Sequence, residues 1–218
     1  MSTETHAEHL DQNYRYQRHV YDVTREYYLL GRRRLIGELE PPPEGSVLEL
    51  GCGTALNLIR AQRRFPQANY YGVDLSRMML ETARASLSRR DLAGRIRLAL
   101  ADATGFDPEA LFGQAVFDRV FFSYSLSMMP PWEAALEHAA KLLSAGGRLH
   151  IVDFGGCERL PPPVKRVLDA WLARFRVSPR EDMEDVLSGL ARRHGLTMSF
   201  ERLYRGYSCY AVLERRIA

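Results

Sequence analysis

The sequence has few cysteines and no long apolar run. Its three cysteines, Cys52, Cys157 and Cys209, are an odd number and none stands in a CxxC pair. Such spacing disfavours a disulfide framework and a zinc site, so we expect free, partly buried thiols. No stretch of about 18 apolar residues is present, and the polar N-terminus lacks the apolar core of a signal peptide. These absences predict a cytoplasmic location and no membrane span.

Lysine and recognisable metal or hydrolase motifs are also scarce. Lys141 and Lys165 are the two lysines among 30 basic residues, and the net charge of +3 is too small to indicate nucleic-acid binding by itself. No HExxH motif, Ser-His-Asp arrangement or cluster of metal ligands occurs, so we expect no metal site. The arginines cluster in pairs and triplets, which are typical either of solvated helix ends or of contact with an anionic surface such as a membrane leaflet.

The main pattern that is present is an alternation of short apolar runs with amphipathic stretches. The apolar runs cover 47–50, 69–73, 96–100, 117–122 and 147–153, and the amphipathic stretches cover 56–64, 77–88, 108–112 and 132–143. This alternation predicts βαβ units around a parallel sheet. Residues 11–39 have helical character and end before three prolines, so we divide the chain into an N-terminal helical closure segment, 1–43, and an α/β domain, 44–218.

The C-terminal third does not continue this alternation of apolar runs and amphipathic stretches. Residues 161–177 carry apolar side chains at helical spacing, and Ser178 to Glu181 reads as a capping box that starts another helix, ending at Gly195. Two strand-like runs, 196–204 and 207–214, predict a terminal hairpin around Gly206 and hence an antiparallel last strand. We treat 157–179 as an insertion that serves as a lid or faces a membrane.

The first apolar run ends in a glycine turn, Glu-Leu-Gly51-Cys52-Gly53-Thr. Its glycines allow a tight turn and close approach of a ligand at the carboxyl edge of the sheet. Leu56 replaces the third glycine of a dinucleotide fingerprint, so a pyrophosphate cradle does not fit. Asp74 ends the second run, 23 residues after Gly51, where a carboxylate reaches a ribose diol. These residues therefore predict a ligand that contains a ribose but no pyrophosphate.

The third apolar run leads into Asp102, whose carboxylate can bind an adenine amino group. The fourth apolar run is followed by Ser123 and Tyr124. The ordered set ELGCGT, GVDLS, LADAT, FDRVFF and LSAGGRLHIVDF resembles the class I S-adenosylmethionine-dependent methyltransferases, over residues 45 to 215. The resemblance implies a Rossmann-like α/β fold. Its sheet would be mostly parallel and seven-stranded, with an antiparallel terminal strand and helices on both faces.

The same resemblance implies S-adenosyl-L-methionine as the cofactor and S-adenosyl-L-homocysteine as its product. The glycines would pack under the methionine portion, Asp74 would hold the ribose hydroxyls, and Ser123 would hold the amino group through its backbone. Glu49 would organise the glycine loop. The full set of implied cofactor-binding residues is Gly51, Cys52, Gly53, Asp74, Leu75, Met79, Asp102, Ala103, Ser123 and Arg32.

A narrower resemblance rests on YDVTREYYLLGRRRLI, GCGT and YSLSMMPPW, which are similar to the bacterial N-methyltransferases of betaine-lipid synthesis. It implies conversion of diacylglyceryl-homoserine to diacylglyceryl-trimethylhomoserine by three methyl transfers. A neutral amine attacks a methyl sulfonium without a catalytic dyad, and aromatic faces hold the resulting quaternary ammonium. On that chemistry the catalytic candidates are Tyr124, Tyr21 and Tyr14, and the substrate-binding candidates are Tyr16, Arg25, Tyr204 and Tyr207.

A lipid acceptor requires contact with a bilayer. Segment 161–177, with Trp171 and Phe175, predicts reversible peripheral contact at the inner face of the cytoplasmic membrane, or else a helix that simply covers the sheet. The alternative acceptors are phosphatidylethanolamine or a small amine, and a non-catalytic S-adenosylmethionine-binding module also stays open. A nucleic-acid partner is disfavoured, because the fourth run is not followed by Asn/Asp-Pro-Pro-aromatic. The sequence makes no prediction of oligomeric state.

Overall fold

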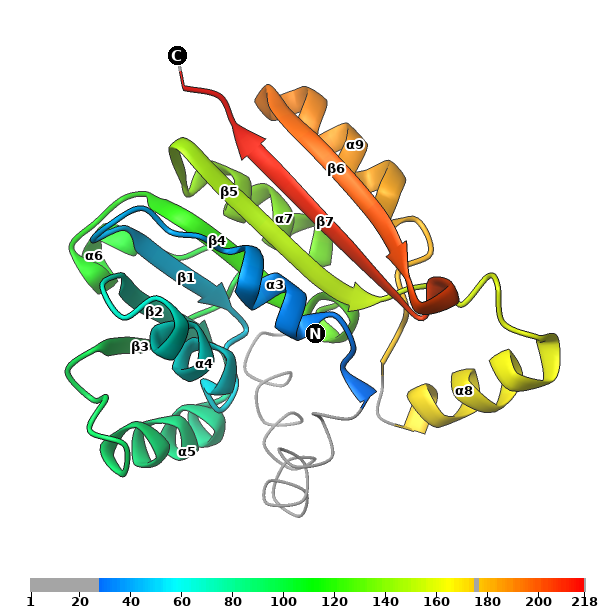
Figure 1. The fold of residues 1–218 in the computed structure, drawn as a ribbon, viewed down its shortest axis with the longest axis horizontal. Coiled ribbons are helices and arrows are strands. Elements are labelled where there is room, and N and C mark those ends of the chain that lie inside the picture. The colour runs from blue at the N-terminus through cyan, green and yellow to red at the C-terminus, as the bar shows by residue number, and fades with distance from the viewer. Residues whose placement is uncertain (1–27, 175–176, 218) are drawn as a thin grey trace.

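Seven strands form a single sheet in the computed structural model, which describes residues 28–174 and 177–217 (Figure 1). The strands run in the order β3-β2-β1-β4-β5-β7-β6, and β7 is antiparallel to both of its neighbours. Their bounds are β1 Ser46–Leu50, β2 Asn69–Asp74, β3 Ile96–Leu100, β4 Phe117–Ser123, β5 Leu143–Phe154, β6 Leu196–Leu203 and β7 Ser208–Arg215. The mostly parallel sheet and the terminal hairpin are therefore confirmed.

Helices cover both faces of this sheet, as expected (Figure 1). On one face Leu35, Leu58 and Leu80 join a core with the strands, and on the other face Trp132 and Leu187 join a second core. The helices are α3 Arg32–Glu38, α4 Leu56–Arg64, α5 Arg77–Ser88, α6 Pro108–Phe112, α7 Trp132–Lys141, α8 Pro162–Arg174 and α9 Met183–His194, with short 3₁₀ turns η1 Leu126–Met128 and η2 Tyr204–Gly206.

The strand order places a switch point between β1 and β4. From β1 the chain moves outward to β2 and β3, whereas from β4 it moves in the opposite direction to β5. In open α/β sheets the crevice outside the carboxyl ends of such strands is where ligands bind. The glycine turn after β1 and the residues after β4 meet at this point.

The expected capping box is wrong. Helix α9 begins at Met183, after Asp182, and the segment from Ser178 to Arg180 stays outside the helix. The amide of Ser178 donates to the carbonyl of Ser127, 3.1 Å away, so the segment is held against η1 by a tertiary contact. This contact overrides the local capping signal. Gly195 does end the helix, with a left-handed φ of 63°.

The first described part of the N-terminal segment belongs to the layer on the α4 side. Helix α3 packs against α4 and β5, and it ends before the prolines at 41–43, as the sequence predicts. The guanidinium of Arg119 on β4 donates to the carbonyls of Leu39 and Glu40, the latter at 2.7 Å, and so caps the end of α3. Residues 1–27 lie outside the described residues. Within the described part, none of the helices combines the length and apolar character needed to cross a bilayer.

Candidate cofactor site

The glycine turn after β1 is held by the neighbouring strand. The amides of Gly51 and Cys52 both donate to the carbonyl of Val73 on β2, each at 2.9 Å. Gly51 has a φ of +75°, and a Cβ there would lie 2.7 Å from the Cβ of Ser125, so this close approach requires glycine. Gly53 has a φ of +52°, and a Cβ there would meet nothing within 4 Å. The turn is therefore closed on the Gly51 side and open on the Gly53 side.

The carboxylate of Asp74 joins two elements at the open side of the turn. One oxygen accepts from the amide of Gly53 at 2.7 Å, and the other accepts from the amide of Ser76 at 2.8 Å. Ser76 caps α5 by accepting from the amide of Met79. In general, each oxygen of a carboxylate can accept more than one hydrogen bond. Asp74 thus lies at the open side of the turn, and its contact with a ribose stays a prediction.

The loop after β3 lies next to the same position, because the amide of Ala101 donates to the carbonyl of Asp74 at 3.1 Å. Asp102 accepts from the amide and hydroxyl of Thr104 through Oδ1, at 2.9 and 2.8 Å. Within the described residues its Oδ2 has no hydrogen-bond donor, and Ala103 beside it is buried. An adenine amino group would find an acceptor at Oδ2.

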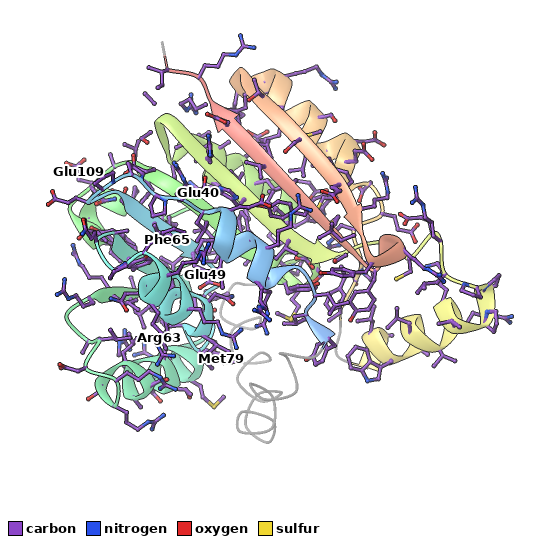
Figure 2. All side chains as sticks on the ribbon, in the orientation of Figure 1. Glu40, Glu49, Arg63, Phe65, Met79 and Glu109 are labelled. Carbon is purple, nitrogen blue, oxygen red and sulfur yellow. The ribbon has the colours of Figure 1, made fainter. Side chains whose placement is uncertain are left out.

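Four further predicted cofactor residues are partly or fully enclosed. Cys52 packs over Gly72 in the core, so its backbone rather than its thiol lines the turn. Leu75 is half-buried and Met79 is buried on α5 (Figure 2). Arg32, the first residue of α3, turns its side chain inward and is 5% exposed. Their contacts with the cofactor stay predictions.

Glu49 stabilises the glycine turn through a hydrogen bond with α4. Its side chain is buried, and Oε1 accepts from the side-chain amide of Asn57 at 2.7 Å, which joins β1 to the first turn of α4 (Figure 2). This is the organising position that the sequence predicts for Glu49.

The chain after β4 forms the opposite wall of the crevice. The hydroxyl of Ser125 donates to the carbonyl of Leu50 at 3.0 Å and ties this wall to the glycine turn. The hydroxyl of Ser123 is buried and has no partner among the described residues. A buried hydroxyl without a partner is costly, so a polar ligand atom beside it would be stabilised.

Tyr124 follows in a left-handed conformation and is 2% exposed. Its hydroxyl donates to the carbonyl of Leu30, and its ring meets Phe154 edge to face with centroids 4.6 Å apart. Burial raises the pKa of Tyr124 well above its ordinary value. The structure gives Tyr124 an anchoring contact with the segment before α3, and its predicted catalytic role stays a prediction.

The two predicted substrate tyrosines on the hairpin differ in environment. Tyr207 is half-buried, donates to the carbonyl of Tyr28 at 2.8 Å and packs edge to face on Phe154, and burial raises its pKa to about 12. Tyr204 lies in η2 and is 55% exposed, so its ring is open to a ligand. The other candidates, Tyr14, Tyr16, Tyr21 and Arg25, lie outside the described residues.

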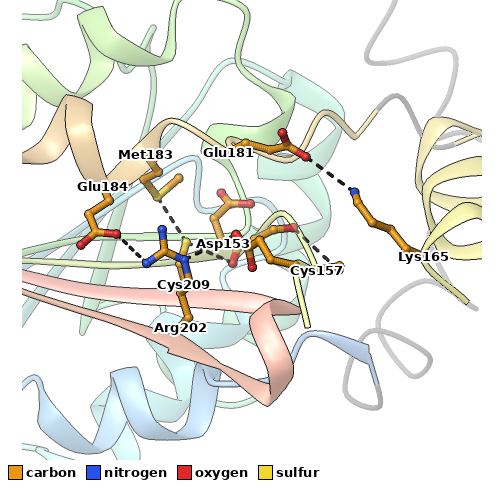
Figure 3. Close-up of polar contacts among 10 residues, drawn as sticks. Asp153, Cys157, Lys165, Glu181, Met183, Glu184, Arg202 and Cys209 are labelled. Carbon is orange, nitrogen blue, oxygen red and sulfur yellow. Dashed lines mark hydrogen bonds and ion pairs between the residues drawn. The ribbon is translucent and has the colours of Figure 1, made fainter. Parts of the chain in front are cut away.

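Sequence reasoning missed an acidic residue that holds the loop after β4. Asp153, at the end of β5, is fully buried and accepts from the amides of Ser127 and Phe154 at 3.2 and 2.8 Å. Its backbone carbonyl accepts from the thiol of Cys209 at 3.5 Å (Figure 3). Burial raises the pKa of Asp153. The only sequence signal was an acid at the end of an apolar strand.

Arg180 holds the same loop from the other side. Its guanidinium donates to the carbonyls of Leu126 and Met129, at 3.3 and 2.8 Å, and lies 5.5 Å from the ring centroid of Trp132. The segment that leads from α8 to α9 is therefore attached directly to the wall of the crevice. Among the described residues, no three His, Cys, Asp or Glu side chains are grouped as metal ligands would be.

A family model described as a methyltransferase domain matches residues 47–147, which include the turn after β1 and the ends of β2, β3 and β4. Residues 47–147 therefore match a methyltransferase domain of the class I S-adenosylmethionine-dependent type. Its cofactor is S-adenosyl-L-methionine. The residues of the crevice fit this cofactor, because Asp74, Asp102 and Ser123 present polar groups around a turn that is open at Gly53.

Curated relatives of this methyltransferase domain act on diverse acceptors. The tRNA1(Val) (adenine(37)-N6)-methyltransferase of Porphyromonas gingivalis is 29% identical over 170 residues, 67% of each chain. Nocamycin O-methyltransferase of Saccharothrix syringae is 31% identical over 67% of this chain and 50% of its own. The ubiquinone/menaquinone biosynthesis C-methyltransferase UbiE of Rhizobium leguminosarum is 28% identical over 69% of this chain and 59% of its own. The matched region thus spans between half and two thirds of these relatives.

Solved structures share the fold at low sequence identity. An O-methyltransferase family protein from Burkholderia thailandensis superposes with a TM-score of 0.70 at 18% identity, covering 95% of this chain and 63% of that one. Geranyl diphosphate C-methyltransferase from Streptomyces coelicolor, in complex with S-adenosyl-L-homocysteine, has a TM-score of 0.66 at 14% identity, covering 86% and 78%. The fold class is confirmed, whereas the acceptor is not decided by fold.

Proposed function

We propose that this methyltransferase transfers methyl groups to the amine of a lipid head group at the inner face of the cytoplasmic membrane. The acceptor is diacylglyceryl-homoserine, and three transfers give diacylglyceryl-trimethylhomoserine. The proposal rests on the resemblance of residues 21–36 and 124–132 to the betaine-lipid N-methyltransferases. The structural observation that supports it is an exposed apolar face on α8, at the carboxyl edge of the sheet where the cofactor residues lie (Figure 1).

The residues at this edge suit an amine acceptor. S-adenosylmethionine supplies an activated methyl group that a neutral amine attacks directly. The loops after β1 and β4 are joined by the Ser125 to Leu50 hydrogen bond, which favours a rigid wall against which an acceptor can be aligned. Tyr204 offers an exposed ring to the quaternary ammonium that three transfers produce.

A nucleobase acceptor, as in the tRNA relative, is less well supported. Enzymes that modify a flipped base stack it against an exposed aromatic or apolar side chain. Tyr124, the aromatic residue that directly follows β4, is 2% exposed and its hydroxyl is bonded to the carbonyl of Leu30. Its ring is therefore unavailable for stacking. This arrangement disfavours a base that stacks on Tyr124, and it equally keeps the Tyr124 ring from direct contact with an amine acceptor, so the preference for a lipid rests on the resemblance and on α8.

The proposal is tested by incubating the purified protein with labelled S-adenosylmethionine and vesicles that contain one acceptor each. The acceptors are diacylglyceryl-homoserine, phosphatidylethanolamine and a demethylated quinone, and ethanolamine in solution serves as a small amine. We expect label in mono-, di- and trimethylated homoserine lipid alone. Label in any other acceptor would replace the proposed one. No label anywhere, with cofactor binding intact by calorimetry, would favour a non-catalytic module.

A further inference from the structure

Helix α8 is attached to the rest of the protein along one side. Leu172 is buried, and Trp171 meets the ring of Tyr28 edge to face with centroids 5.1 Å apart. Near its first turns, the ammonium of Lys165 pairs with Glu181 at 3.6 Å (Figure 3). The helix lies beyond the end of β5, clear of the sheet (Figure 1). Its other side is left facing solvent.

That outward side carries several exposed apolar side chains. Val167 is 73% exposed, Val164 51% and Trp171 38%. Arg166 is the one exposed charged residue among the side chains that the structure describes on this helix. After its first residue, Pro162, the exposed apolar residues of α8 are Pro163, Val164, Val167, Ala170, Trp171 and Ala173. We refer to these six residues as the α8 face. Exposed apolar residues gathered on one helix indicate a partner that is itself apolar.

Two arginines next to this helix have no counter-charge. The amide of Arg159 donates to the carbonyl of Arg205 at 3.3 Å, so the two residues lie side by side, and both are exposed. No described carboxylate pairs with either guanidinium, since the neighbouring Glu158 pairs with Arg202 at 3.4 Å. Adjacent cations repel each other unless an anionic surface neutralises them. Tyr204, exposed beside Arg205, is a residue type favoured at membrane interfaces.

We propose that the α8 face, together with Arg159 and Arg205, is the surface by which this protein binds an anionic lipid bilayer. The inference rests on the proposed function and identifies the residues that bring the site to its acceptor. An apolar face with flanking arginines matches an interface of acyl chains and anionic head groups. A second copy of the chain is a poorer occupant, because a two-fold contact through α8 would bring like charges together.

Vesicle flotation tests the apolar part of this surface. The full-length protein is mixed with vesicles of phosphatidylglycerol and phosphatidylcholine in equal parts, or of phosphatidylcholine alone. We expect binding to the anionic vesicles, which Val167→Asp lowers at least tenfold, because it places a charge at the acyl boundary. The matched control is Val116→Asp, at an apolar residue that is 44% exposed and directly precedes β4, at the opposite edge of the sheet. It should bind as the unaltered protein does.

The arginines are tested in the same way. Arg159→Gln and Arg205→Gln should each weaken binding to anionic vesicles about fivefold, and their effects should diminish at high salt. Arg95→Gln, an exposed arginine directly before β3, is the control that should change nothing. Unaltered binding by Val167→Asp would overturn the proposal. A dimer seen by light scattering and abolished by Val167→Asp would also overturn it, in favour of a second copy.

The bilayer-binding surface and the proposed acceptor can be tested separately, because either can be wrong without the other. Methyl transfer is therefore also measured with detergent-solubilised acceptors. Vesicle binding that follows the expected variant pattern, without methylation of any lipid, would leave the surface standing and discard the proposed acceptor. Methylation of solubilised diacylglyceryl-homoserine without vesicle binding would establish the function and overturn the surface.

Discussion

The carboxylate of Asp74 and the backbone amide of Gly53 lie 2.7 Å apart, which ties the end of β2 to the open side of the glycine turn after β1. Parallel pairing of Leu50 with Val73 brings these two strand ends together. One side chain thus stabilises the loop and stands where the ribose of the cofactor is expected. Both the contact with Gly53 and the expected contact with the ribose depend on its negative charge.

Asp74→Asn should therefore weaken S-adenosylmethionine binding. An amide retains one acceptor oxygen and loses the charge-assisted bonds, which predicts an increase in Kd of about 10- to 100-fold. Isothermal titration calorimetry measures this change. Asp91→Asn, which neutralises an exposed carboxylate at the end of α5 away from the turn, is the control and should leave Kd unchanged. Equal affinity in Asp74→Asn and the unaltered protein would contradict the ribose assignment.

The two glycines of the turn should respond differently to alanine. At Gly51 a Cβ would lie 2.7 Å from Ser125 and 2.9 Å from Met129, so Gly51→Ala should cost about 2–4 kcal/mol of unfolding free energy. At Gly53 a Cβ would meet nothing within 4 Å, so Gly53→Ala should cost about 1–2 kcal/mol, from its positive φ.

The same Gly53→Ala substitution fills the space that we assign to the cofactor. It should raise the Kd for S-adenosylmethionine at least tenfold while most of the stability remains. Urea unfolding and calorimetry on both variants separate the two effects. Gly53→Ala with normal cofactor affinity would place the cofactor elsewhere.

His150 should make the protein sensitive to acid. It is buried in β5 against Tyr210, whose hydroxyl is 3.0 Å from Nδ1, and burial together with the charges of Arg119 and Arg148 lowers its pKa to about 3. In the unfolded chain the imidazole of His150 would bind a proton near pH 6.5. In the native state it stays neutral until the pH approaches 3. The unfolding free energy should therefore fall as the pH falls from about 6.5 toward 3, by up to ~1.4 kcal/mol per pH unit.

The His150→Asn variant lacks this titrating group and keeps an acceptor for Tyr210. The difference in unfolding free energy between the two proteins should shift in favour of the variant at each step from pH 7 to 6 to 5, measured by urea unfolding. If the unfolding free energies of the two proteins changed in parallel over this pH range, His150 would not be the cause of the acid sensitivity.

The three thiols should be unreactive in the native protein. Cys52, Cys157 and Cys209 are all buried, and burial raises the pKa of Cys209 to about 12 and that of Cys52 above its ordinary value. Little thiolate of Cys52 or Cys209 is therefore present at pH 8, and burial blocks the access of reagent to all three thiols. Ellman's reagent should label no thiol rapidly in buffer and all three in guanidinium chloride. Rapid stoichiometric labelling of the native state would show that at least one thiol is accessible.

Much of the fold could be predicted because its signals are local. The alternation of apolar runs and amphipathic stretches predicted β1 to β4, and helical spacing predicted α8, which the structure describes over Pro162–Arg174. Gly195 ended α9 because a left-handed residue is a local requirement that glycine meets. The spacing of Asp74 from Gly51 predicted the neighbourhood in which the two now lie.

The sequence by itself determined the order of strands and helices and the polar residues that end each strand at one edge, because periodicity and turn chemistry act over a few residues. Tertiary structure alone decided the rest. It buried Tyr124 under the segment before α3, set Asp153 and Arg180 around η1, and kept Ser178 to Arg180 outside α9. It also left the α8 face open to solvent. These outcomes depend on contacts between residues distant in the chain, which no local pattern encodes.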